Sequence, residues 1–289
     1  IFRWDADDLL YTDNALLEKA MTVFERSGLT IAYRYGKKFK RGMEINAMRE
    51  KRGWIHANGL HDHSQPGHIN AEFLEPIKNK LEYRVHTVYG FNKGKFCPDY
   101  FTDDQEFGRI FKEFLRFTIA SMAMRPGEMI VMDHEPWNTL EWCYCDRSRK
   151  KFAQYIDLDH VPDIAEIKKK YVYEWSRFRC ENTAKMTKMY RDVVSRHFPG
   201  LKLADYDYAV DFSHSDYRTA YYRVAKDPEL NEQFFDAHLS SYYHIIDKAA
   251  FNMIRINSRK LKKDYIPNCA IDGPGTFLTA SEILSPAQA

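Results

Sequence analysis

An amphipathic helical pattern followed by a short β-rich run recurs along the chain, and this alternation constrains the fold most strongly. The β-rich runs cover residues 29–35, 53–59, 83–89, 129–132, 201–207, 235–243 and 265–271. The helical patterns that precede them cover residues 14–27, 44–51, 72–80, 103–124, 166–197, 217–234 and 247–263. Such alternation indicates an α/β fold with a parallel sheet and crossover helices. Seven units without a glycine-rich phosphate loop favour a (β/α)8 TIM barrel over a doubly wound sheet.

Residues 1–289 are predicted to form one barrel domain that lacks its last strand. The chain starts at Ile1 without a methionine and stops at Ala289 in what reads as the first turn of a helix. We therefore interpret it as a fragment of a longer polypeptide, with the eighth strand beyond Ala289.

The composition restricts the partners of the protein. Its 43 basic and 41 acidic residues leave a net charge of +2, so no electrostatic footprint for nucleic acid or an anionic membrane is present. No apolar segment approaches the length needed to cross a bilayer. The aromatic content of 15% suits either a packed core or a groove for a sugar. Compartment and oligomeric state stay open.

The apolar run at residues 129–132 ends in the sequence Asp-His-Glu-Pro-Trp at residues 133–137. In a strand, Val131, Asp133 and Glu135 share one face. Two carboxylates at the end of a buried strand are costly unless the strand opens into a site. Hydrolysis of a glycosidic bond needs such a carboxylic acid together with a second carboxylate. A structural ion pair is the alternative interpretation.

The segment His134-Glu135-Pro136-Trp137 resembles the Asn-Glu-Pro segment that ends the fourth barrel strand of clan A glycoside hydrolases. In that clan the glutamate is the acid/base, and by the count above residues 129–132 are also the fourth strand. The resemblance implies a glycoside hydrolase with Glu135 as general acid/base and His134 in place of the asparagine that contacts the sugar 2-hydroxyl. Asp133 is a further catalytic candidate, and Trp137 is expected in the sugar-binding wall.

A cysteine pattern extends the resemblance to family-42-type β-galactosidases. There, a Cys-x-Cys-x-x-Cys run after the acid/base joins an upstream cysteine to hold a structural zinc. Cys97, Cys143 and Cys145 match the first three ligands, and Ser148 replaces the last. The resemblance, which spans residues 83–289, implies a possible structural zinc completed by His or Asp, and no cofactor for the reaction itself. A cluster of free cysteines is the alternative.

The second carboxylate of the reaction is less clearly marked. Clan A enzymes carry a nucleophilic glutamate at the end of strand seven, where this chain has Asp272. We take Asp272 as the nucleophile of a retaining mechanism, although a plain turn also suits its Asp-Gly-Pro-Gly setting. Asp205, Asp207 and Asp236 are other candidates. A substrate acetamido group oriented by Asp133 is a further alternative.

Trp54 is expected in the same sugar-binding wall as Trp137. His86 and Tyr242 are additional candidates for contacts with a carbohydrate, and core or rim packing is the alternative for both. Two rival functions stay open. One is a metal-dependent barrel hydrolase or lyase that uses the loop formed by His61, Asp62 and His63. The other is a non-catalytic carbohydrate-binding barrel.

Overall fold

The structure is a computed structural model that describes residues 13–26, 28, 30–35, 39–60, 74–78, 80–87, 90–103, 105–132, 143–208, 225, 227–242 and 264–269. The helices in these ranges are α2 (Asn14–Arg26), α3 (Lys40–Lys51), α4 (Glu75–Lys78), η3 (Leu81–Tyr83), α5 (Tyr100–Asp103), α6 (Gln105–Ser121), α7 (Asp146–Tyr155), α8 (Ile164–Lys170), α9 (Val172–His197), α11 (Pro228–Asn231) and η4 (Glu232–Phe234). The strands are β1 (Ile31–Tyr33), β2 (Ile55–Leu60), β3 (Arg84–Thr87), β4 (Gly90–Phe96), β5 (Met129–Met132), β6 (Lys202–Tyr208), β7 (Ala237–Tyr242) and β8 (Asp264–Cys269).

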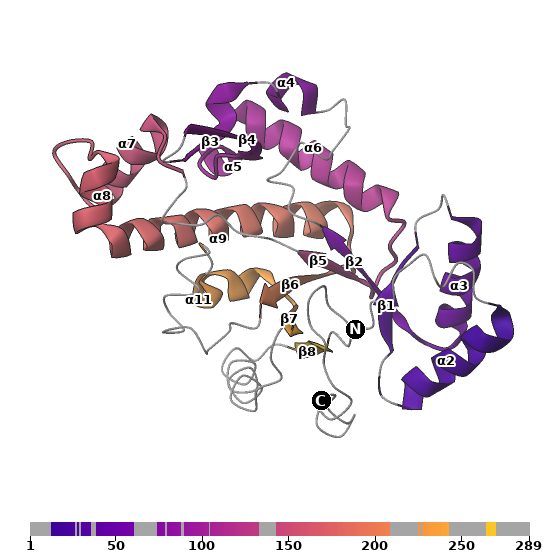
Figure 1. The fold of residues 1–289 in the computed structure, drawn as a ribbon. Coiled ribbons are helices and arrows are strands. Elements are labelled where there is room, and N and C mark those ends of the chain that lie inside the picture. Colours follow the sequence, from indigo (N-terminus) through magenta and orange to yellow (C-terminus); the bar gives the residue numbers. More distant parts are fainter. Residues whose placement is uncertain are drawn as a thin grey trace.

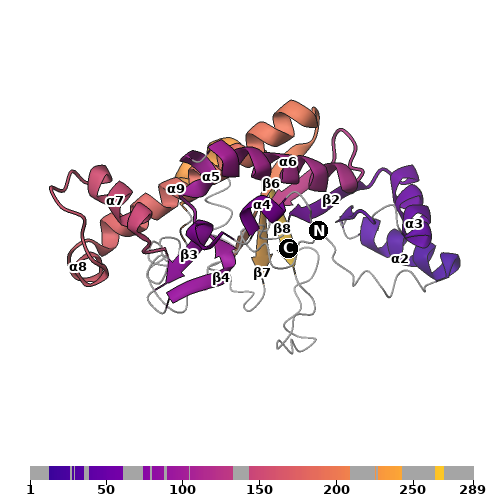
Figure 2. The ribbon, with the colours of Figure 1, turned by 90° about the horizontal axis from the view of Figure 1, so that it is seen from above.

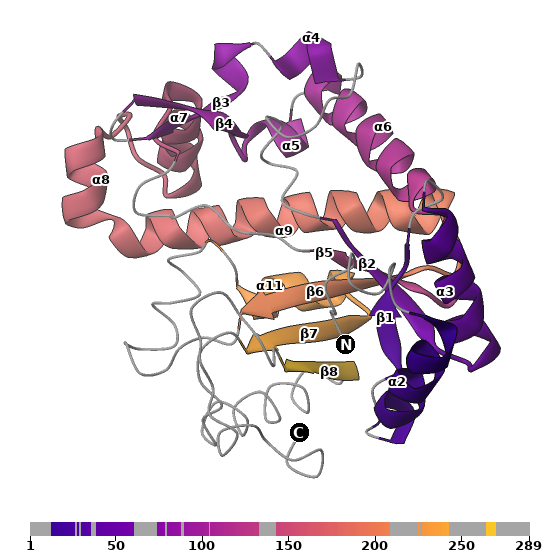
Figure 3. The same cartoon turned by 45° about the vertical axis from the view of Figure 1, so that its right-hand side comes forward.

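Six strands form one parallel sheet whose neighbours follow the order of the chain, β1-β2-β5-β6-β7-β8 (Figures 1 and 3). In a doubly wound sheet the strand order reverses at a switch point, and no reversal occurs here. The unbroken order is that of a singly wound barrel wall. The described residues thus confirm an α/β fold with a parallel sheet, of which they contain six strands.

The prediction that residues 83–89 form the third strand of this sheet is wrong. Strand β3 pairs antiparallel with β4 in a separate two-stranded hairpin, apart from the main sheet (Figure 2). A parallel neighbour needs a crossover of a dozen or more residues, whereas only two residues separate β3 from β4. Strand β5 therefore pairs directly with β2 and is the third strand of the described sheet, not the fourth.

The two faces of the sheet are packed differently. One face packs against α6 and α9 in the largest apolar cluster, to which the sheet contributes Leu60, Ile130, Met132 and Leu203. Helix α6 joins it through apolar residues at helical spacing, among them Phe107, Phe111, Phe114 and Leu115. The opposite face carries mostly small side chains, with Ala57, Met129, Val131, Ala204 and Ala237 in one small cluster.

The periphery holds two further packed units at opposite ends of the molecule (Figure 1). Helices α2 and α3 pack on β1, and helices α7 and α8 pack on the amino-terminal half of α9. The predicted helix at residues 166–197 is in fact divided into α8 and α9 at Tyr171. None of the described helices combines the length and the apolar character needed to cross a bilayer.

Candidate metal centre

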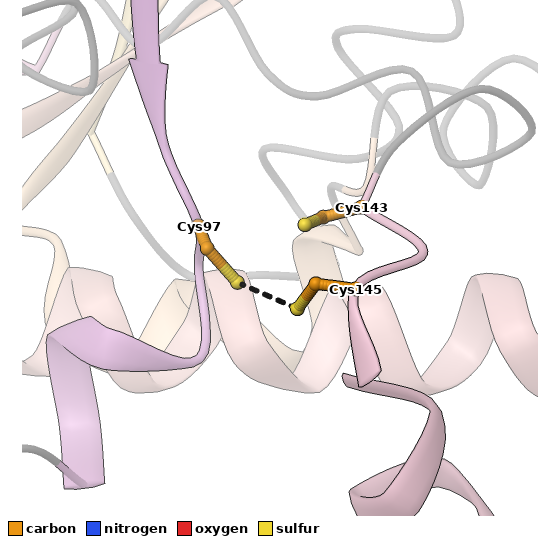
Figure 4. A group of neighbouring side chains, drawn as sticks. All are labelled: Cys97, Cys143 and Cys145. Atoms are coloured by element: carbon orange, nitrogen blue, oxygen red, sulfur yellow. Dashed lines mark hydrogen bonds between the residues drawn. The ribbon is translucent and has the colours of Figure 1, made fainter. Parts of the chain in front are cut away.

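Two distant stretches of the chain bring three cysteines together. Cys97 follows β4 directly, and Cys143 and Cys145 precede α7 (Figure 4). Cys145 is the N-cap of α7, and its sulfur accepts a hydrogen bond of 3.4 Å from the backbone N–H of Ser148. The first turn of a helix favours an anion, so this position suits a thiolate.

The three sulfur atoms are arranged as the ligands of one ion would be. They lie within 4.8 Å of one another, and Sγ of Cys97 is 3.8 Å from Sγ of Cys145. Thiolates bound to a single tetrahedral Zn²⁺ at about 2.3 Å are about 3.8 Å apart. A disulfide would need about 2.0 Å, and the cysteines are free thiols. The spacing therefore fits a shared metal ion.

Ser148 lies beside the cluster. In the sequence it stands where the Cys-x-Cys-x-x-Cys pattern has its last cysteine. Its Oγ lies 3.2 Å from Sγ of Cys145 and 3.6 Å from Sγ of Cys97. The hydroxyl also donates a hydrogen bond to the carboxylate of Asp99. Both Ser148 and Asp99 are buried, so this polar group is held away from water.

Asp99 is the centre of a buried network that surrounds the thiols. Its carboxylate accepts hydrogen bonds of 3.1 Å from Arg179 and 3.0 Å from Asn182, both on α9. Sγ of Cys97 lies 3.7 Å from the same carboxylate. The Arg179 guanidinium also donates to the carbonyl of Cys143 and lies over the ring of Trp175. This guanidinium therefore places a positive charge beside the three cysteines.

The pKa values of the thiols diverge because they share hydrogen bonds. Burial raises the pKa of Cys97 and raises that of Cys143 to about 12. Hydrogen bonds from Cys143 and Cys97 hold the pKa of Cys145 well below its usual range. The pKa of Cys145, at the amino terminus of α7, is thus lowered while burial raises the other two.

A second group of potential ligands consists of Glu50, His56 and Glu128. It lies at the amino-terminal ends of β2 and β5 rather than at their carboxyl ends. The guanidinium of Arg34 lies among these side chains, 2.5 Å from Glu128, 3.1 Å from Glu50 and 3.2 Å from Nδ1 of His56. Arg125 pairs with Glu50 as well, so two guanidinium groups already face the two carboxylates. This group therefore fits a structural ion-pair network better than a metal site.

The structure places only part of the predicted site. Most of the predicted site residues lie outside the described residues. These are Asp133, His134, Glu135, Trp137, Asp272, His61, Asp62 and His63. His86 lies on the hairpin strand β3, and Tyr242 ends β7. The structure describes the backbone of these two residues but not their side chains.

Trp54 is a core residue rather than part of an exposed sugar-binding wall. Its side chain is 6% exposed and packs with Leu17, Met21 and Ile45. The indole N–H donates a hydrogen bond of 2.9 Å to Glu25. Trp54 also precedes β2, at the edge of the sheet opposite the carboxyl ends of the strands. The prediction for this residue is therefore wrong.

Two of the alternative carboxylates, Asp205 and Asp236, lie away from the carboxyl ends of the strands. Asp205 is buried on the same face of β6 as Leu203, which is the face covered by helices. Asp236 precedes β7 and accepts hydrogen bonds of 2.6 and 3.2 Å from Arg191. Neither residue lies where it would face a substrate at the carboxyl ends of the strands. The side chain of Asp207 is outside the description.

Sequence reasoning missed Asp99, Arg179 and Asn182 as partners of the cysteines. Two signals were present: Asp99 stands two residues after Cys97, and Arg179 follows Trp175 and Phe178 in the helical pattern at residues 166–197. Neither signal indicates on its own that the two side chains meet.

No protein-family model matches the chain, and no curated protein matches it. Among solved structures, a β-galactosidase from the psychrophilic Marinomonas ef1 is similar, with a TM-score of 0.46 and 11% sequence identity. The similarity covers 81% of this chain and 39% of that one, so the chain spans well under two thirds of that β-galactosidase. A likeness at this level establishes neither a family nor an activity.

Proposed function

We propose that the protein is a glycoside hydrolase in which Glu135 is the general acid/base. The observation that carries the proposal is the position of Val131 on β5. Val131 lies on the sheet face opposite α6 and α9, between Gly59 of β2 and Ala204 of β6. The next residues of the same parity in the sequence are Asp133 and Glu135.

The order of the strands supports this location. All six strands are parallel, so their carboxyl ends lie at one edge of the sheet, which is the edge that carries active sites in barrel enzymes. β5 is the third strand of the described sheet, whereas the acid/base of clan A enzymes follows the fourth strand. The number of strands from β5 to the last described strand nevertheless matches that pattern. β8 lies three strands beyond β5, as strand seven lies three beyond strand four. Asp272 follows β8 by three residues and remains the proposed nucleophile.

In the proposed retaining reaction, the protonated Glu135 gives its proton to the leaving glycosidic oxygen while Asp272 attacks the anomeric carbon. Water, deprotonated by Glu135, then releases the sugar and regenerates both groups. The substrate would be a carbohydrate, and the reaction itself needs no cofactor.

Hydrolysis of a panel of aryl glycosides by the full chain tests the proposal. Replacement Glu135→Gln should lower turnover by about 10²- to 10⁴-fold, because it removes the proton donor. Glu113→Gln, an exposed glutamate on α6, should keep wild-type activity. Equal activity of the Glu135 variant and the wild type would exclude the assigned role.

Two other outcomes would favour the rival functions. Saccharide binding without turnover would indicate a carbohydrate-binding barrel. Loss of turnover after chelation, restored by added metal and abolished by His61→Ala, would indicate the metal-dependent hydrolase.

We also propose that Cys97, Cys143 and Cys145 hold a structural zinc ion. The observation in favour is the convergence of their three sulfur atoms. When bound, the ion would supply a cross-link between the end of the β3–β4 hairpin and the start of α7. Cys143 follows Glu135 by eight residues, so such a link would anchor the segment that carries the proposed acid/base. Elemental analysis of the purified full chain, with Cys97→Ser for comparison, tests this assignment.

A further inference from the structure

The thiol cluster contains three sulfur donors, whereas a closed structural zinc site has four ligands. Within the described residues, the side-chain oxygen atoms closest to these sulfurs belong to Ser148 and Asp99. Oγ of Ser148 lies 3.2 and 3.6 Å from two of them, and a carboxylate oxygen of Asp99 lies 3.7 Å from Cys97. Among the described residues, the fourth donor therefore has two candidates.

The hydrogen bonds of Asp99 distinguish the candidates. One of its oxygens accepts from Ser148 and Arg179, and the other accepts from Asn182. Binding a metal through Asp99 would disturb the buried pair that it forms with Arg179. Removing a buried carboxylate from its guanidinium is expensive. Asp99 is better suited to orient a ligand than to be one.

Ser148 is oriented as a donor to a cation. A hydroxyl has one proton, and Ser148 gives that proton to Asp99. Its remaining lone pairs are available on the side of Cys97 and Cys145. In the metal-free cluster the S–H groups of these cysteines can donate to them. Once a metal ion displaces those protons, a cation between the oxygen and the sulfurs offsets the repulsion between the lone pairs and the thiolates.

The charge of the site favours the same ligand. Arg179 and Asp99 offset each other, so three thiolates and a divalent ion leave one net negative charge. A fourth thiolate would leave two, and buried charge without a partner is costly. A neutral serine oxygen completes the coordination without adding charge.

We propose that Ser148 Oγ is the fourth ligand of a divalent metal ion held by Cys97, Cys143 and Cys145, and that Asp99 is the positioning residue that orients the hydroxyl. The inference rests on the metal centre proposed above. It makes this centre an S3O site, in contrast to the four-cysteine site of the family that the sequence resembles. Carboxylates that accept a hydrogen bond from a metal ligand, and so orient it, are a general feature of metal sites.

Titration of the metal-free full chain with Co(II) tests the inference, because cobalt–thiolate charge-transfer absorbance reports the number of bound sulfurs. The wild type should bind one ion with three thiolates. Ser148→Cys should raise that absorbance by about a third, because it adds a fourth thiolate. Ser148→Ala and Asp99→Asn should weaken binding by about 10- to 100-fold.

Thr187→Val is a matched control, because it removes a buried hydroxyl of α9 that donates to the Thr183 carbonyl. It should bind Co(II) like the wild type. Wild-type affinity and spectrum in Ser148→Ala would overturn the role of Ser148 and leave the metal centre standing. No binding by the wild type would overturn both. If Ser148→Ala does not fold, an unchanged charge-transfer band in Ser148→Cys is itself sufficient to overturn the inference.

Discussion

Arg179 on α9 donates a hydrogen bond of 3.1 Å to the carboxylate of Asp99, and both side chains are 1% exposed. Eighty residues separate them in the chain. The pair joins the longest helix to the turn between β4 and α5, and it forms the wall of the thiol cluster. Because both charges are buried, removing either one would leave the other without a partner and would destabilise the fold.

Replacement of Arg179 by Met should lower the free energy of unfolding by about 3–5 kcal/mol, because it leaves the Asp99 carboxylate buried without its cation. Arg177→Met is the matched control on the same helix. Its side chain is 54% exposed, so the change should stay within about 0.5 kcal/mol. Urea denaturation of both variants measures the difference. Similar losses in the two variants would contradict the buried ion pair.

Gly42 provides a test of packing between α3 and β1. A Cβ at this position would lie 2.4 Å from Cβ of Tyr35, which is fixed to the backbone. Gly42→Ala should therefore destabilise the fold by about 1–3 kcal/mol, despite the better helix propensity of alanine. In α6, a Cβ at Gly108 would meet only the Phe101 carbonyl at 3.7 Å, so Gly108→Ala should be neutral or stabilising by up to about 1 kcal/mol. Thermal unfolding that ranks the two variants in the opposite order would contradict this packing.

His56 should make stability depend on pH. Its imidazole is buried, and this burial lowers its pKa below the usual 6.5, although Glu128 opposes the shift. As the pH falls below about 6.5, the unfolded chain therefore takes up a proton before the folded protein does. Stability is complete above this pH and is lost as the pH falls through the lowered folded-state pKa.

Unfolding measured between pH 7 and 5 should thus show a loss that His56→Asn reduces. His160 is the matched control, since it is exposed and its pKa is raised by Asp159 and Glu166. It contributes with the opposite sign, so His160→Asn should leave the acid loss unchanged or larger. An equal loss in wild type and His56→Asn would show that His56 is not responsible.

The small side chains on the sheet face opposite α6 and α9 should tolerate little additional volume. Ala204 is fully buried beside Val131 and Met129. Ala204→Leu should cost about 1–3 kcal/mol, because the added atoms displace these neighbours. Lys202→Leu, at the exposed start of the same strand, should change stability by no more than about 0.5 kcal/mol. If urea denaturation gave the same loss in the free energy of unfolding for both variants, Ala204 would not lie in a packed layer.

Most of the fold follows from local hydrophobic patterning. Six of the seven predicted strands form the parallel sheet, because apolar runs between amphipathic helices define these elements within short windows of sequence. The resemblance of the Cys97, Cys143 and Cys145 pattern to that of family-42-type β-galactosidases also implied that the three cysteines lie together. Both predictions use information that lies in neighbouring residues or in a short motif.

The partners of these elements were decided by tertiary structure. Residues 84–87 have the composition of a strand, but their antiparallel pairing with β4 depends on the short connection between the two. Trp54 looks equally suited to a sugar or a core, and its packing against α2 and α3 decides for the core. Asp99 and Arg179 are charged residues that composition alone would place at the surface. They are buried because α9 packs against the turn between β4 and α5. A buried charge requires a partner, and only the folded chain brings that partner near.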